Sequence, residues 1–294
     1  GLVSFSIAHA ADNEVLLDEV NVVGSAPAPY QPEVAKVGPL GEKALLDTPY
    51  SIHVLPAPLM ENQQLKSVRD AFRYFPTVQG ENIRPQTRGL QAGVVQNTRI
   101  DGMNIAATTD YPIEQFEDIQ VLNGLAGALY GPSNPAGTFN YVLKRPTAKP
   151  LRRLNIGYSS QASASAHADL SGYFGESQRF GYRINLLKEG GEGYVQDSKL
   201  DRSLISLALD MKITNNTRLE TNFSRYHYTS KGFPGTFELQ DASILFPHAP
   251  DPKRVGYGQP FAGDDNLTKT YSARLNHRFN PDWSLTAGIL KQSS

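Results

Sequence analysis

The stretch Ile113–Pro146, IEQFEDIQVLNGLAGALYGPSNPAGTFNYVLKRP, alternates short apolar runs with strong turn signals. It predicts a strand, a turn, one or two helical turns, a Gly/Pro loop and a second strand. In order, these elements are Ile119 to Leu122, Asn123-Gly124, Leu125 to Tyr130, Gly131-Pro132 and Phe139 to Leu143. Taken by itself, the pattern is that of an α+β core segment.

The same stretch resembles the distal half of the plug domain of TonB-dependent outer-membrane receptors, a segment of the type E-R-I-E-V-L-x-G-P-x-x-x-L-Y-G-x-x-x-P-G-G-x-I-N-x-V-x-K-R-P. Three positions depart from that pattern, because Gln120 replaces a Glu, Asn123 a basic residue and Leu125 a Pro. The matching residues are Glu117, Ile119, Val121, Leu122, Gly124, Leu129, Tyr130, Gly131, Pro135, Gly137, Asn140, Val142, Lys144, Arg145 and Pro146.

The chain before this stretch also has a globular pattern. From Leu59 to Phe75 the apolar residues recur at helical spacing, which predicts one amphipathic helix that Pro76 ends. Tyr50 to Leu55 predicts a strand. This region resembles the first plug motif of the family at Thr48, Pro49, Ser51, Ile52, Val54, Ser67, Asp70, Ala71, Tyr74, Pro76 and Val78, and further family elements at Arg88-Gly89 and Arg99-Ile100-Asp101-Gly102-Met103.

Composition excludes several classes of protein. The 294 residues carry a net charge of −1, which gives no electrostatic footprint for nucleic acid. The absence of cysteine excludes disulfides and thiolate metal sites. The six histidines are scattered and none has metal-ligand spacing. No nucleophile elbow, phosphate loop or dinucleotide motif is present, so we expect no enzyme and no resident cofactor.

The amino terminus predicts an export signal followed by a tethered strip. Residues 1–10 are apolar and end Ala8-His9-Ala10, a small-x-small cleavage pattern; the alternative is a frayed first strand. Residues 18–23 alternate in character and precede a Pro/Ala-rich leash, which suits strand addition to a partner's sheet edge. In the resembling family the TonB box lies here, at Asp18, Glu19, Val20, Asn21, Val22 and Val23. The short interval from Ala11 to Asp18 leaves no room for a signalling domain, which favours a transporter over a transducer.

After Lys149 the sequence predicts seven strands of period two. The predicted connections alternate between tight turns and longer loops, of which Thr229 to Lys269 is by far the longest. This is the pattern of an outer-membrane barrel, although a soluble sandwich also alternates. Aromatic residues near strand ends suit an interfacial girdle: Tyr158, Phe174, Phe180, Phe279 and Trp283.

The predicted fold is therefore an α+β plug domain followed by antiparallel transmembrane β-barrel strands, a partial barrel. Seven strands cannot enclose a plug of about a hundred residues, since barrel width grows with strand number, and the resembling receptors have about 22 strands. The expected divisions are residues 1–10 (signal remnant), 11–44 (TonB box and linker), 45–149 (plug) and 150–294 (first part of the barrel).

The resemblance also implies site residues. Plug loops that face outward in the family carry ligand contacts, and the matching loops offer Arg84, Gln91, Thr109 and Tyr111, which suit an oxygen-rich anionic chelate. We expect Arg88, Arg99, Lys144 and Arg145 to face carboxylates of the barrel wall; the alternative is a set of exposed surface ion pairs.

The resulting expectation is an outer-membrane receptor, with plug and TonB box facing the periplasm, that imports a ferric siderophore. Its partners would be TonB with its inner-membrane complex, the siderophore and outer-membrane lipid, and iron would enter only as the chelate. Alternatives are the same machinery with another scarce ligand (cobalamin, haem, metal chelate or glycan), a passive porin, or a soluble β-rich module.

Overall fold

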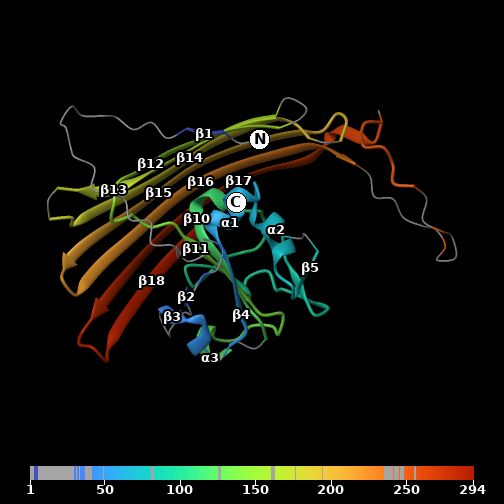
Figure 1. Ribbon diagram of the computed structural model, residues 1–294. Coiled ribbons are helices and arrows are strands. Elements are labelled where there is room, and N and C mark those ends of the chain that lie inside the picture. Colours follow the sequence, from blue (N-terminus) through green and yellow to red (C-terminus); the bar gives the residue numbers. More distant parts are fainter. Residues whose placement is uncertain are drawn as a thin grey trace, which may run out of the picture. The chain divides into compact units, whose positions relative to one another are not determined.

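The computed structural model describes residues 3–5, 30, 32, 34–36, 42–48, 50–80, 83–124, 127–159, 163–175, 177–193, 195–234, 241, 245, 248–254 and 256–294. Contacts divide the chain into two compact units. The α+β unit comprises residues 6–145 and 288–290, and the sheet unit comprises residues 1–5, 146–287 and 291–294. Figure 1 labels the elements of both.

The α+β unit is built on a five-stranded sheet, in which β10 lies between β4 and β11 and the order is β4-β10-β11-β8-β9. Strand β10 is antiparallel to both neighbours, whereas β11 and β8 run parallel. The strands are β4 (Ile52–Pro56), β8 (Thr98–Ile100), β9 (Met103–Asn104), β10 (Phe116–Leu122) and β11 (Thr138–Leu143). Smaller sheets pair β2 (Val34–Lys36) with β3 (Glu42–Ala44), and β5 (Val78–Gln79), β6 (Gln86–Thr87) and β7 (Leu90–Gln91). The strands predicted at residues 50–55, 119–122 and 139–143 are confirmed.

The single helix predicted from Leu59 to Phe75 is wrong. Gln64 has a positive φ of 54°, which ends the first helix, and Ser67 then caps a new one by exchanging hydrogen bonds with Asp70. The helical segments are η2 (Leu45–Asp47), α1 (Ala57–Asn62), α2 (Val68–Ala71), η3 (Phe72–Tyr74), η4 (Ile113–Gln115) and α3 (Gly127–Tyr130). None of the described helices is long and apolar enough to span a membrane.

The core of the α+β unit lies between the main sheet and these helices. Phe72 of η3 meets Phe139 of β11 edge to face, with ring centroids 5.7 Å apart. Phe116 packs against Tyr111 and Tyr141 in the same core. All six residues of β11 are buried, so its two faces are both covered. Residues 113–146 therefore supply two adjoining strands of this sheet, β10 and β11.

The sheet unit is one antiparallel sheet in the order β1-β12-β13-β14-β15-β16-β17-β18. Figure 1 shows these strands side by side as one curved layer. The strands are β1 (Val3–Phe5), β12 (Leu151–Ser159), β13 (Ser163–Phe174), β14 (Phe180–Glu192), β15 (Lys199–Thr214), β16 (Thr217–Pro234), β17 (Gly258–Arg278) and β18 (Ser284–Ser293). The seven strands predicted after Lys149 are all present.

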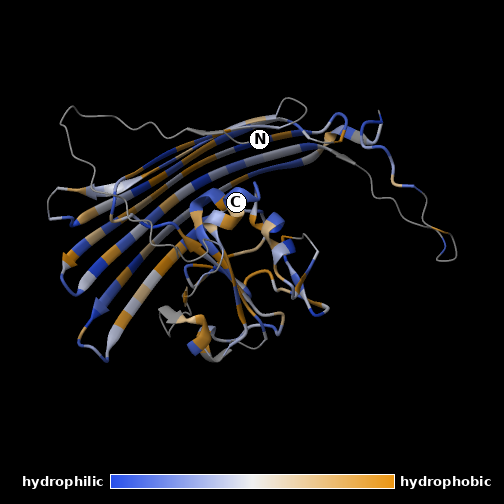
Figure 2. Cartoon of the chain, in the orientation of Figure 1, coloured by the Kyte–Doolittle hydropathy of each residue, from blue (hydrophilic) through white to orange (hydrophobic). Residues whose placement is uncertain are grey.

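The predicted alternation sorts the two faces of this sheet. On β14, Arg183, Asn185 and Glu189 are buried, while Phe180 and Leu186 of the opposite parity are exposed. The bands of orange and blue along the strands in Figure 2 follow this period. The expected girdle residues Tyr158, Phe174, Phe180, Phe279 and Trp283 are all exposed. One face is thus polar and the other apolar, as lipid contact on one side requires.

The strands are longer than the sequence predicted. The loop expected from Thr229 to Lys269 shrinks to residues 235–257, because β16 continues to Pro234 and β17 already begins at Gly258. β17 has 21 residues, whereas about 9–11 cross a bilayer. Beyond the register partners Arg225 and Lys269, the odd-numbered positions of β16 carry His227, Thr229 and Lys231 in place of apolar residues, so the apolar period that predicted the earlier part of the strand ends there.

Some predictions fall outside the described residues. β1, within the expected signal remnant, pairs with β12 in antiparallel register, while residues 6–10 are outside the described part. The expected TonB box, residues 18–23, also lies outside it.

Candidate functional site

Two tight hairpins shape the loops of the α+β unit. Arg88-Gly89 joins β6 to β7, and Asp101-Gly102 joins β8 to β9, with positive φ at all four residues. Two successive residues of positive φ make the turn that fits the twist of a two-residue hairpin. The Arg-Gly and Asp-Gly pairs noted in the sequence are therefore backbone signals, whatever else their charges do.

A buried amide ties these hairpins to the segment before β11. Asn97 has 0% exposure and donates from Nδ2 to the carbonyl oxygens of Asn134 and Gly137, at 3.0 and 2.5 Å. Its Oδ1 accepts from the backbone N–H of Gly93 at 2.9 Å. Asn134 in turn donates to the carbonyl oxygen of Gln91 at 2.8 Å. The loop that carries Gln91 is thus held by side-chain amides to the loop that ends at Gly137.

The four predicted ligand residues differ in accessibility. Gln91 is exposed and Arg84 is half-buried. Thr109 is only 6% exposed, and Tyr111 is 3% exposed and belongs to the core with Phe116 and Tyr141. The ring of Tyr111 therefore offers little surface to a ligand. Three exposed apolar residues that the sequence did not single out lie beside Gln91 in the chain: Leu90, Val94 and Val95.

Asp110 anchors the loop of Thr109 and Tyr111 to helix α2. Its Oδ1 accepts from the backbone N–H groups of Arg69 and Tyr111 at 3.3 and 2.9 Å, and its Oδ2 lies 3.5 Å from Nε of Arg69. The N–H of Val68 donates to the carbonyl oxygen of Tyr111 at 2.9 Å. Burial raises the pKa of Asp110 in spite of these partners.

The raised pKa predicts a pH effect on this anchor. The folded state holds the proton more tightly than the unfolded state, so the resulting stabilisation is fully present below about pH 3.9 and is lost as pH rises through the folded pKa. Asn at position 110 resembles the protonated carboxyl at every pH, whereas wild type loses this stabilisation as the pH rises. The free energy of unfolding of Asp110→Asn minus that of wild type should therefore be more positive at pH 7 than at pH 4. Hydrogen exchange at the Val68 amide, corrected for intrinsic rate, measures this. Asp47 is exposed, so Asp47→Asn is a control and should not change the exchange rate at either pH. If Asp110→Asn differs from wild type by the same amount at both pH values, the prediction is contradicted.

Two of the four expected wall-facing cations, Arg99 and Lys144, make contacts within the α+β unit. The guanidinium of Arg99, 4% exposed, donates to the carbonyl oxygens of Gly102 and Tyr130 at 3.2 and 3.0 Å and lies 4.6 Å from the Tyr130 ring centroid. Burial lowers the pKa of Arg99. Lys144 pairs with Glu61 of α1 at 3.1 Å. That Arg88, Arg99, Lys144 and Arg145 also meet the barrel wall stays a prediction.

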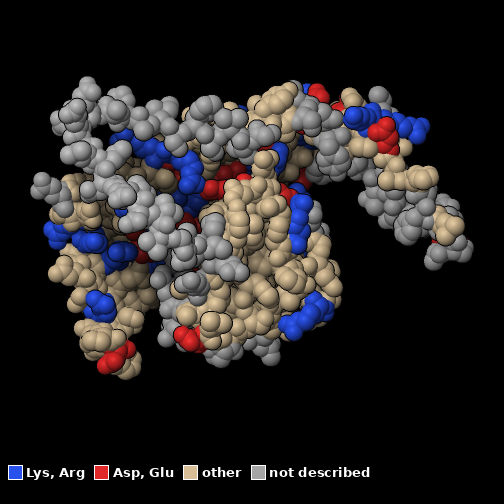
Figure 3. Space-filling model, viewed as in Figure 1, with Lys and Arg blue, Asp and Glu red and all other residues tan. Residues whose placement is uncertain are grey.

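Ion pairs line the polar face of the sheet unit. The guanidinium of Arg183 binds both oxygens of Asp169, at 2.9 and 2.8 Å, and Asp169 is 0% exposed. Arg202 binds Oε2 of Glu189 at 2.8 and 2.5 Å, and Arg274 binds Oε2 of Glu220 at 2.8 and 2.6 Å. Figure 3 shows blue and red atoms side by side over these strands. This face is therefore charged but internally compensated.

We expect Glu189→Gln to lower the free energy of unfolding by about 1.5–3 kcal/mol, the range for a hydrogen bond to a charged group. The side chains of Arg202 and Glu189 are 3% and 4% exposed, so water cannot solvate the Arg202 guanidinium once the Glu189 carboxylate is removed. Asp201→Asn is a matched control, because Asp201 pairs with Lys188, the residue next to Glu189. The side chains of this second pair are exposed, at 45% for Asp201 and 65% for Lys188. It should cost less than about 1 kcal/mol. Urea unfolding of the complete protein in phospholipid vesicles measures both, and equal losses would contradict the argument.

Comparison with known proteins agrees with this architecture. Residues 44–138 match the family model of the TonB-dependent Receptor Plug Domain, which covers the main sheet from β4 into β11. Residues 44–138 carry a plug domain of the TonB-dependent receptor type. This family comprises transport receptors rather than enzymes, and its members are outer-membrane proteins with a plug that faces the periplasm. The α+β unit is accordingly the plug, and the sheet unit is the wall of the receptor's barrel.

Three curated relatives show how far the likeness extends. The metal-pseudopaline receptor CntO of Pseudomonas aeruginosa is 29% identical over 176 residues, 58% of this chain and 23% of that protein. The ferrichrome receptor FcuA of Yersinia enterocolitica is 22% identical over 86% of this chain and 34% of its own length. The ferric-pyoverdine 358 receptor of Pseudomonas putida is 21% identical over 94% and 35%. The chain thus spans about a quarter to a third of the length of these relatives.

Solved structures share the fold. The FpvAI–pyocin S2 complex superposes with a TM-score of 0.77 at 19% identity, over 90% of this chain and 35% of that one. BauA, the ferric preacinetobactin receptor of Acinetobacter baumannii, gives 0.75 at 23% identity, over 88% and 40%. The receptor's plug and wall are thus similar in fold to those of known siderophore receptors.

The described part of the receptor holds no cluster of three or more His, Asp or Glu side chains placed to bind a metal ion. The chemistry that its plug loops offer is hydrogen bonding and apolar contact, through Gln91, Arg84 and the exposed Leu90, Val94 and Val95. Such a surface suits a ligand that presents oxygen atoms and apolar groups outward.

Proposed function

We propose that the complete receptor imports a ferric siderophore across the outer membrane with energy from the TonB complex. The observation that carries this proposal is the plug domain at residues 44–138, together with relatives named as ferrichrome, pyoverdine and ferrioxamine B receptors. Iron is the cargo of this transport and enters as the chelate, and the receptor holds no cofactor of its own.

The energetics explain why import needs external work. Capture of a dilute chelate at about 1 nM corresponds to a binding free energy of about −12 kcal/mol. With an association rate of about 10⁶ M⁻¹s⁻¹, release takes place at about 10⁻³ s⁻¹. Cargo held this tightly leaves too slowly unless the site is disturbed. A tethered strand that pairs with TonB can transmit a pull to the plug, and Asp18–Val23 has the alternation and position for this role.

The plug is built to respond to such a pull as a connected body. The amide chain through Asn97 and Asn134 links the Gln91 loop to the segment that enters β11. Lys144, directly after β11, is paired with Glu61 of α1. A displacement at the Gly137 end of β11 would therefore act on the Gln91 loop, and one at the Lys144 end would act on α1.

One relative favours a second candidate cargo. The metal-pseudopaline receptor has the highest identity of the relatives given above, at 29%, so a chelate of another metal is the alternative. Uptake of labelled chelates by cells that carry the complete gene, with and without TonB, tests both. We expect TonB-dependent uptake of at least one ferric siderophore. Uptake confined to chelates of other metals would replace the cargo, and uptake that is equal without TonB would overturn the proposal.

A further inference from the structure

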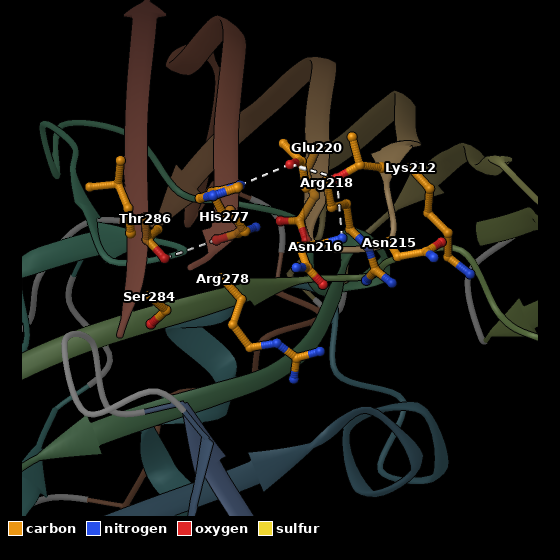
Figure 4. Close-up of a pocket in the computed structure, with 13 residues that line it drawn as sticks. Lys212, Asn215, Asn216, Arg218, Glu220, His277, Arg278, Ser284 and Thr286 are labelled. Carbon is orange, nitrogen blue, oxygen red and sulfur yellow. Dashed lines mark hydrogen bonds between the residues drawn. The ribbon is translucent and has the colours of Figure 1, made fainter. Parts of the chain in front are cut away.

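The sheet unit has a polar pocket of about 400 Å³ at its short-turn end. It lies where the β15–β16 turn approaches the ends of β17 and β18, and Figure 4 shows the side chains that surround it. The backbone N–H of Arg278 donates to the carbonyl oxygen of Asn216 at 2.9 Å, which holds the two turn regions together. The pocket is therefore formed by residues that are distant in sequence and close in the sheet.

Three cations line this pocket, one from each of three neighbouring strands: Lys212, Arg218 and Arg278. The one carboxylate in the lining, Glu220, is held through two hydrogen bonds by Arg274, so its charge is compensated. No ion pair joins Lys212, Arg218 or Arg278 to a carboxylate within the described part of the chain. The pocket thus carries an excess of positive charge on a face where the other charges come in pairs.

The cations belong to the polar face of the sheet. Lys212 and Arg218 are register partners and have the same parity as Asp210 and Glu220, which are buried on that face. Nζ of Lys212 lies 5.9 Å from the ring centroid of Tyr173. Lipid contacts the opposite, apolar face, so the occupant of this pocket comes from the aqueous side.

The remaining lining adds hydrogen-bond donors around the cations. Hydroxyl groups come from Thr214, Thr217, Ser284 and Thr286, and amides from Asn215, Asn216 and Asn276. Some of these groups are already ordered, since Thr214 donates to Thr217 Oγ1 at 2.9 Å and Thr286 donates to Asn276 Oδ1 at 2.9 Å. Guanidinium forks with nearby hydroxyls and amides are the chemistry that recognises carboxylate and phosphate oxygens.

We propose that this pocket binds a small solute rich in oxyanions, either a carboxylate-bearing chelate or a phosphate. Its volume is in the range of small-molecule sites, and Leu285 is the one apolar side chain in its lining. If the cargo is an anionic chelate, the pocket is a second binding site for it, at the short-turn end of the wall. That role rests on the proposed function, whereas the oxyanion site itself does not.

Isothermal titration of the complete receptor in detergent micelles tests the site, with ferric citrate and inorganic phosphate as separate probes. We expect Arg218→Gln/Arg278→Gln to weaken binding of the preferred probe at least tenfold. Lys199→Gln/Lys231→Gln is the matched control, because it removes two exposed cations that face each other on β15 and β16 at the opposite end. It should bind like wild type. Arg218→Lys/Arg278→Lys keeps both charges but loses the guanidinium forks, so it should bind more weakly than wild type and more tightly than the glutamine variant, an order that loss of fold would not produce.

The outcomes separate the two proposals. Citrate binding that is lost only in the glutamine variant supports a carboxylate site, and phosphate binding lost in the same way supports a phosphate site. Equal affinity of wild type and the glutamine variant for both probes, or no binding of either, overturns the inference. If Arg218→Gln/Arg278→Gln abolishes probe binding but the wild-type receptor transports no siderophore, the oxyanion site is supported and the proposed cargo is contradicted.

Discussion

Gly137→Ala should disrupt the plug at the point where β10 and β11 meet. Gly137 has a φ of +94°, and a Cβ there would lie 2.4 Å from the carbonyl oxygen of Leu122. Leu122 pairs with Thr138, so the overlap would separate the two central strands of the plug at that end. Left-handed strain of about 1–2 kcal/mol and overpacking of about 1–3 kcal/mol give an expected loss of about 2–5 kcal/mol in local stability.

Gly131→Ala provides the matched control for this prediction. Gly131 also has a positive φ, +78°, but a Cβ there would meet no atom within 4 Å. It should therefore lose only the strain of about 1–2 kcal/mol. Hydrogen exchange at the amide of Phe139, which donates to the carbonyl oxygen of Asn97, reports the difference in the complete receptor. Equal exchange in the two variants would show that the close approach at Gly137 is unimportant.

The alternation of apolar and polar residues predicted the wall strands well, because successive side chains of a strand point to opposite faces of the sheet and the two faces differ in polarity. On β15, Ile205 and Leu209 are exposed while Ser206 and Asp210 are buried, as their alternation required. The prediction failed where this contrast ends. Past Arg225 on β16, the apolar alternation gives way to His227 and Thr229, and backbone pairing with β15 and β17 continues the strand.

Local capping explains the main error in the plug. The apolar residues Leu65, Val68, Phe72 and Phe75 have helical spacing and are all buried, so their assignment to the core was correct. The continuous helix was wrong because Ser67 and Asp70 form a capping box that starts α2 anew. That signal was present in the sequence and outweighs periodicity over so short a segment.

Burial limited the prediction of the ligand site. Thr109 and Tyr111 were predicted from the loop order of the resembling family and from their chemistry, but Tyr111 packs against Phe116 and Tyr141 in the core. Nothing local to residues 106–111 distinguishes an exposed phenol from a core ring, since the partners come from β10 and β11, at residues 116 and 141. Val94 and Val95 are exposed, but the sequence did not single them out, because apolar side chains are expected in the buried core.

Removal of Asp18–Val23 is the prediction that bears on energy coupling. This segment alternates Val20 and Val22 with polar neighbours on a Pro/Ala-rich leash, so it suits pairing with a partner's strand. The strands of the plug sheet and the loops around Gln91 lie outside this segment of the sequence. Ligand capture should therefore survive while transport is lost.

The most direct test measures binding and uptake of one labelled ferric siderophore in the same cells, with the complete receptor and with the receptor lacking residues 18–23. The account predicts wild-type binding at the cell surface and no energy-dependent uptake by the deletion variant. A variant with the adjacent residues 24–29 deleted, which shortens the Pro/Ala-rich segment but keeps residues 18–23, should retain both. Uptake by the receptor lacking residues 18–23 at the wild-type rate would contradict the central claim.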